Sequence, residues 1–203
     1  MFSFKSLRKK KQDSIAQAES TSGDSYAVLK AASSLAMSTA TSALSLDFSD
    51  SYKYLRTSNA TKLDAVLFSC FILRAICIVS TRNRAKAIVF SHEYVSSVIS
   101  LAKDLFSDSF NPSIVDSRLA FYDRVFAKSE GFENSVSAVK EEFEYIIKND
   151  IHENRFAPFS ESSSLPILGL DADLQCSFEV NSYFKFLLSN VKGTLDESIT
   201  AIQ

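Results

Sequence analysis

Glycine and proline are placed in this 203-residue chain in a way that strongly constrains its fold. In the interior of a helix glycine costs about 1 kcal/mol relative to alanine, and proline costs about 3 kcal/mol. The seven residues of these two types all fall between apolar periodic segments, at Gly23, Pro112, Gly131, Pro158, Pro166, Gly169 and Gly193. This distribution predicts an all-α fold in which helices are joined by loops.

The apolar periodicity predicts a mostly antiparallel helical bundle of six to seven helices. A helix that is apolar nearly all round, at 62–80, is typical of the centre of such a bundle. Whether residues 62–106 form one helix or two is left open, although Asn83 is a good N-cap for a second one. The helices are expected at about 25–45, 49–58, 62–80, 84–106, 112–128, 132–149 and 172–192, with a short terminal turn from Thr194.

Several local signals refine these expectations. Thr61 and Asp64 resemble a capping box for the central helix, and Asn111-Pro112 is a typical helix start. Residues 150–170 are expected to form a long crossover or a functional loop. The buried stripe of the 84–106 helix is assigned to Ile88, His92, Val95, Ile99, Ala102 and Phe106.

The first 23 residues differ in character from the rest of the chain. They are basic and then rich in serine, with little apolar content after Leu7, so we expect a disordered tail followed by one helical domain at 24–203. The whole chain has a net charge of −2, and without the five tail bases the remainder carries −7. Tail residues that could contact an anionic membrane or a nucleic acid are Phe2, Phe4, Lys5, Leu7, Arg8, Lys9, Lys10 and Lys11.

The location in the cell is inferred from what the sequence lacks. Cys70 and Cys77 are separated by about 10 Å of helical rise, too far for a disulfide, which suits a reducing compartment. The apolar stretch 65–79 is too short to cross a bilayer and contains Arg74. No apolar segment of a secretory signal follows the basic start. We therefore expect a cytoplasmic protein, with peripheral membrane association as an alternative.

Motifs for catalysis and metal binding are weak in this sequence. His92-Glu93 does not continue into HExxH, because position 96 is serine. No GxSxG motif and no glycine-rich phosphate loop is found. We therefore expect no metal and no cofactor, and an enzyme is the less favoured interpretation.

Arg74 is the most informative single residue, because it lies inside an apolar helix. A buried arginine needs a partner, and an ion pair with Asp104, Asp123, Glu141 or Glu142 is the simpler expectation. The alternative is a ligand- or anion-binding group formed by Arg74, Arg82, Arg84 and His92.

These features favour a non-enzymatic interaction or scaffold module that binds a protein partner, or itself, through an exposed helix groove. The supporting observation is a high content of aromatic residues, 17 Phe and 7 Tyr, which often anchor interfaces. One alternative is a membrane or nucleic-acid adaptor that uses residues 1–12. The other is a small-ligand-binding or enzymatic bundle with a pocket near Arg74, covered by the 150–170 loop.

Overall fold

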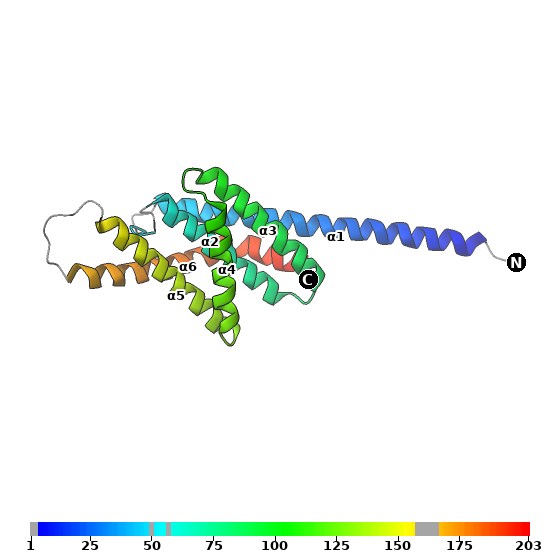
Figure 1. Cartoon of the computed structure of the whole chain (residues 1–203). Helices are drawn as coiled ribbons and strands as arrows, with labels where there is room; N and C mark the ends of the chain where they lie inside the picture. The colour runs from blue at the N-terminus through cyan, green and yellow to red at the C-terminus, as the bar shows by residue number, and fades with distance from the viewer. Residues whose placement is uncertain (1–3, 49–50, 56–57, 157–166) are drawn as a thin grey trace.

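The computed structural model describes the backbone of residues 4–48, 51–55, 58–156 and 167–203. Within these ranges the chain forms six α-helices and one 3-10 helix, with no β-strand (Figure 1). The predicted all-α bundle is therefore confirmed. The elements are α1 (Phe4–Leu44), η1 (Ser45–Phe48), α2 (Asn59–Ser80), α3 (Arg84–Leu105), α4 (Pro112–Lys128), α5 (Phe132–Phe156) and α6 (Ile167–Ile202).

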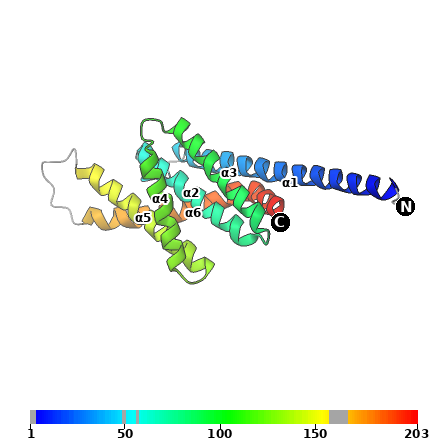
Figure 2. The same ribbon diagram turned by 45° about the vertical axis from the view of Figure 1, so that its right-hand side comes forward.

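Helix α2 is the centre of the bundle and contacts each of the other five helices. Figures 1 and 2 show it running through the middle of the bundle, with its C-terminal end at the edge, where the turn leads into α3. Its largest side chains, Phe68 and Phe71, are buried, and the Phe68 ring stacks on Phe143 of α5 with centroids 4.4 Å apart. Fully burying a side chain of this size contributes about 1.5–3 kcal/mol. The prediction of a central, all-round apolar helix is confirmed.

Of the helices with described side chains, α2 alone is long and apolar enough to cross a membrane. However, 67% of its most apolar stretch is buried inside the bundle. Because most of this apolar surface is already covered by protein, α2 is explained as a core helix of the bundle.

Helix α1 packs mainly against α3 and α6. It does so through small side chains, which allow close approach of the backbones; the buried alanines are Ala32, Ala36, Ala40 and Ala43. Two buried hydroxyl groups, on Thr39 and Ser42, donate to backbone carbonyls one turn earlier in the same helix. These bonds satisfy polar groups that would otherwise be costly to bury.

The N-terminal half of α1 corrects one expected boundary. The helix begins at Phe4 and not near residue 25, because the segment contains strong helix formers such as Lys, Gln, Ala and Glu. Figures 1 and 2 show this half projecting away from the bundle. A helix without packing is only marginally stable. The side chains of residues 1–23 lie outside the described part of the chain.

The boundaries around α2 and α3 are decided by capping groups. α2 is capped by Ser58, whose hydroxyl accepts from the Thr61 amide at 3.0 Å, so Thr61 is in the first turn and is not the cap. The short helix expected at 49–58 is replaced by η1 and a turn at residues 51–55. Residues 62–106 form two helices, and Asn83 caps the second by accepting from the Lys86 amide at 3.1 Å.

Helices α5 and α6 are both longer than expected. α5 continues to Phe156, and α6 runs unbroken from Ile167 to Ile202, so the expected 150–170 loop is shorter and the separate terminal turn at Thr194 does not exist. Residues 157–166, with Pro158 and Pro166, lie outside the described part of the chain. The helical packing of α6 on α1 and α2 supplies stability that local propensity does not.

The placement of glycine at junctions is therefore only partly correct. Gly131, with φ of 83°, forms the turn before α5, and Pro112 is the first residue of α4, both as expected. By contrast, Gly23, Gly169 and Gly193 lie inside helices. A glycine inside a helix is tolerated when the rest of that helix is well packed.

A buried carboxylate connects α6 to the turn before α2. Glu179 is fully buried, and its Oε2 atom accepts from the backbone amides of Tyr54 at 2.7 Å and Leu55 at 3.3 Å. The Gln175 side chain donates to Oε1 at 3.4 Å. Hydrogen bonds to a charged acceptor are the stronger kind, worth about 1.5–3 kcal/mol each. Glu179 therefore holds residues 51–55 against the core.

We expect Gly193→Ala to stabilise the protein by about 0.5–1 kcal/mol, because a methyl group at this helical position meets no atom within 4 Å. Gly131→Ala is the matched control and is expected to destabilise by about 1–2 kcal/mol, since its φ of 83° is strained for alanine. Urea denaturation measures both. A loss of stability in Gly193→Ala would contradict the unbroken α6.

We expect Glu179→Ala to cost about 2–4 kcal/mol, because two buried amides lose their acceptor. Glu179→Gln keeps one carbonyl oxygen and is expected to cost about 1 kcal/mol. Glu197→Ala, at an exposed position of the same helix, is the control and is expected to change little. Equal denaturation midpoints for all three variants would show that Glu179 does not hold the turn.

Candidate functional site

A solvent-open groove of about 680 Å³ runs between α2 and α3. Its surface is mainly apolar, with an arginine from each helix and one histidine from α3. Three of the four ligand-binding candidates from the sequence, Arg74, Arg84 and His92, lie in this one groove. The complete lining is Arg74, Ile78, Arg84, Ala87, Ile88, Ser91, His92, Val95, Ser96 and Ile99.

The groove exists because α3 is apolar on two faces. One face is buried in the core and consists of Ala87, Phe90, Tyr94, Val98 and Ala102. The other face, Ile88, His92, Val95 and Ile99, lines the groove. The sequence-based assignment of this stripe to the core is therefore wrong for Ile88 and His92, which are exposed. It is confirmed for Ala102 and Phe106, which are buried, and in part for Val95 and Ile99, which are half-buried against the core. Ile88 is 62% exposed and Ile78 of α2 is 40% exposed, which leaves large apolar groups open to solvent.

The orientation of α3 is fixed by aromatic groups on its buried face. The Tyr94 ring stacks on Phe90 with centroids 5.7 Å apart, and the Tyr94 hydroxyl hydrogen-bonds to Thr39 of α1 at 2.8 Å. Burial raises the pKa of Tyr94 well above its usual value, so the hydroxyl stays neutral. The stripe that contains Phe90 and Tyr94 is the fully buried one, because these aromatic side chains bury more area than the aliphatic residues of the other stripe.

Arg74 lies on the α2 wall of the groove and is 19% exposed. Its Nη2 atom donates to Oδ1 of Asp123 on α4, one of the four partners expected from the sequence, and its guanidinium lies 5.3 Å from the centre of the Phe71 ring. Its Nε atom is buried without a hydrogen-bond partner among the described residues. Arg74 is thus held in place, but its donors are not all used.

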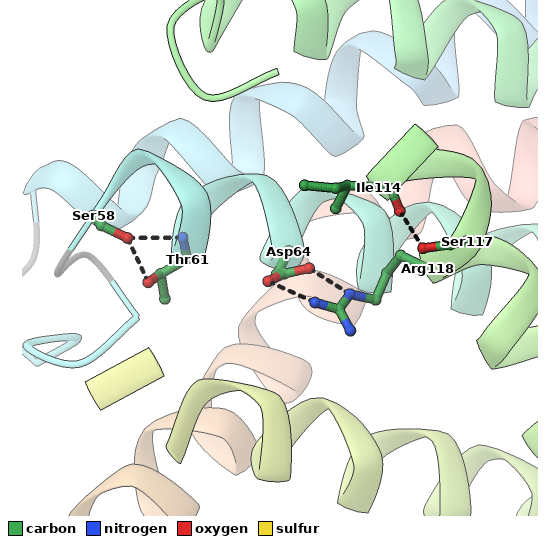
Figure 3. A network of polar contacts seen from close by, with 6 residues as sticks. All are labelled: Ser58, Thr61, Asp64, Ile114, Ser117 and Arg118. Atoms are coloured by element: carbon green, nitrogen blue, oxygen red, sulfur yellow. Dashed lines mark hydrogen bonds and ion pairs between the residues drawn. The ribbon is translucent and has the colours of Figure 1, made fainter. Parts of the chain in front are cut away.

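A second ion pair between α2 and α4 is made through two nitrogens of the arginine. Arg118 of α4 donates to Asp64 of α2 through two nitrogens, Nε at 2.8 Å and Nη2 at 3.4 Å (Figure 3). Asp64 is 15% exposed, whereas Asp123 is 54% exposed. The Arg118 pair is therefore the stronger clamp, because two-point contacts and burial both strengthen an ion pair.

Arg84 and Arg82 have different surroundings. Arg84 is the first residue of α3 and lines the groove, while Arg82, in the turn before it, is exposed and does not. Lys86, in the same helical turn as Arg84, pairs with Asp24 of α1 at 3.3 Å. No ion pair of Arg84 is found among the described residues. The structure thus brings together three of the predicted residues and leaves Arg82 out.

The chemistry available in the groove is that of contact and charge. Its lining contains no carboxylate and no thiol. The nearby thiols of Cys70 and Cys77 are buried, and burial raises the pKa of each to about 12, so they remain protonated. Within the described part of the chain no three His, Cys, Asp or Glu residues converge as metal ligands.

Other predicted functional residues are not placed by the structure. The side chains of the basic tail lie outside the described residues. What the sequence analysis missed is that two apolar stripes share the 84–106 helix. The signal was present, since Phe90, Tyr94 and Val98 repeat every four residues beside the stripe that was chosen.

Comparison with protein-family models, with curated proteins and with solved structures finds no match for this chain.

The two ion pairs between α2 and α4 are expected to differ in their contribution to stability. Asp64→Asn removes the charge that Arg118 contacts twice and is expected to cost about 1–3 kcal/mol. Asp123→Asn acts on a half-exposed pair and is expected to cost less than about 1 kcal/mol. Chemical denaturation compares the two isosteric variants directly. A larger loss for Asp123→Asn would reverse the assignment.

Proposed function

We propose that this protein is a non-enzymatic interaction module, and that the groove between α2 and α3 binds a helix of a partner protein. The observation that carries the proposal is the second apolar face of α3. Ile88, Val95 and Ile99 repeat at spacings of seven and four residues, which places them on one side of α3 beside the fully buried stripe. Val95 and Ile99 are half-buried against the core, whereas Ile88 is 62% exposed.

The shape of the groove supports a helical occupant. Its walls are two adjacent helices, and the lining on α3 extends from Arg84 to Ile99, about four helical turns. An amphipathic helix commonly binds a hydrophobic groove through apolar residues spaced three, four and seven apart. When a partner covers the large apolar groups of such a groove, their removal from water lowers the free energy of the complex.

The walls of the groove also suit binding because they are already fixed. α3 is held by the Asn83 cap and by the Tyr94 contact with Thr39, and α2 is held by the core on most of its surface. A preformed surface loses little conformational entropy when a ligand binds. The apolar lining, with its single histidine and no carboxylate, favours binding over acid–base chemistry.

The test is a selection of displayed amphipathic helices against the purified full chain. The library has a fixed leucine stripe and flanking positions randomised among Glu, Gln and Lys. We expect helical binders whose affinity falls about tenfold or more in Ile88→Gln, because an apolar contact in the groove is lost. Fluorescence anisotropy with a selected peptide gives the dissociation constants.

The matched control is Met37→Gln, which changes an exposed apolar residue on α1 that does not line the groove. This variant is expected to keep the affinity of the unmodified chain. Because both positions are exposed, both variants are expected to keep the thermal midpoint. Binders that respond to neither change, or to both alike, would refute the groove as the binding site.

A further inference from the structure

We propose that the partner helix is acidic, and that its carboxylates contact Arg84 and His92 while its apolar face covers Ile88. This inference rests on the proposed function and adds the chemistry of the partner. It is argued from the charges around the groove, from the position of Arg84 on α3 and from the spacing of the two polar groups.

The charge around the groove has one sign. Among the ten lining residues there are two arginines and one histidine, and no aspartate or glutamate. Two carboxylates belong to neighbouring positions and do not line the groove: Asp123 pairs with Arg74 and balances its charge, and Glu93, next to His92, accepts from the Ser97 hydroxyl at 3.3 Å. The remainder of the chain outside the basic tail is acidic, with a net charge of −7, so a cationic groove is a local exception. Complementary charge on a partner would give specificity and faster association.

Arg84 occupies an electrostatically unfavourable position within the protein itself. It is in the first turn of α3, where the helix dipole favours anions and where the sequence supplies no acidic residue. The chain compensates its neighbour Lys86 with Asp24. Among the described residues no carboxylate forms an ion pair with Arg84, and Arg84 lines the groove. A carboxylate of a partner protein would interact favourably both with the Arg84 guanidinium and with the positive end of the α3 helix dipole.

The spacing of the polar groups sets the pattern expected on the partner. Arg84 and His92 are eight residues apart on one helix, a rise of about 12 Å. A partner helix lying along α3 would present carboxylates to both if its acidic residues were seven or eight positions apart. The apolar residues between them would then meet Ile88 and, across the groove, Ile78 of α2. Arg74, on the opposite wall, is paired with Asp123, so Arg84 is the lining arginine that has no ion pair among the described residues.

Other occupants are less compatible with these charges. The basic segment 1–12 of this chain would place like charges beside Arg74 and Arg84. A second copy would bring the same groove, and so the same charges, to a symmetric contact. An acidic helix from a different protein meets neither obstacle.

The experiment uses the same displayed library, read by the residues enriched at the flanking positions. We expect Glu to be enriched over Gln and Lys to be depleted. The charge-reversing variant Arg84→Glu is expected to invert this preference toward Lys. With a purified Glu-flanked peptide, Arg84→Gln is expected to weaken binding about two- to fivefold, and added salt to weaken it further.

Arg82→Glu is the matched control, because this arginine is exposed two positions away and does not line the groove. It is expected to leave the preference for Glu unchanged. Binders that need Ile88 but show no preference for Glu would overturn this inference and leave the proposed function standing. The absence of any binder sensitive to Ile88→Gln would overturn both. A dimer in sedimentation that Arg84→Gln dissociates would identify a second copy as the occupant and overturn an acidic partner.

Discussion

Burial of α2 is the constraint on which the remaining helices depend. Its side chains are apolar on almost every side, so five other helices must surround it to remove them from water. α3 contributes to this cover mainly through the fully buried Phe90, Tyr94 and Val98. On its second apolar face Val95 and Ile99 are half-buried against the core, and Ile88 stays exposed. The groove is the surface that remains once α2 has been covered.

Polar contacts decide how the helices are aligned around that centre. Two ion pairs join α2 to α4 with opposite direction: Asp64 of α2 contacts Arg118, and Arg74 of α2 contacts Asp123. These two contacts fix the position of α4 along α2, because a shift along the helix axis would separate the oppositely charged groups. The buried Tyr183 hydroxyl, which hydrogen-bonds to Ser69 at 2.8 Å, aligns α6 on α2 in the same way. Apolar burial provides the driving force, and these contacts provide the alignment.

The sequence predicted the central helix and the start of α4 at Pro112, because both depend on local signals. It favoured a break at Asn83 but left open whether residues 62–106 form one helix or two. It did not predict the full length of α6, since Gly169 and Gly193 disfavour a helix locally and only tertiary packing overrides them. It also placed Ile88 and His92 in the core and missed the fully buried Phe90 and Tyr94, because two stripes of similar apolarity differ mainly in side-chain size. The role of Glu179 was beyond prediction, because the amides that donate to it, those of Tyr54 and Leu55, are about 125 residues away in the sequence. The candidate site was found in part: Arg74, Arg84 and His92 were named, but their shared groove depends on how α2 and α3 pack.

Two features of α3 that do not serve the fold, Ile88 and Arg84, both lie on its groove side. Ile88 is an exposed apolar residue that weakens solubility, and Arg84 is a cation in a first turn that disfavours it. Each feature would be a small cost if it occurred alone. Local choices that disagree with the fold are expected where a sequence serves a function instead. Both costs disappear together when one ligand carries an apolar stripe beside a carboxylate, which is why a single acidic helix accounts for them better than two unrelated partners.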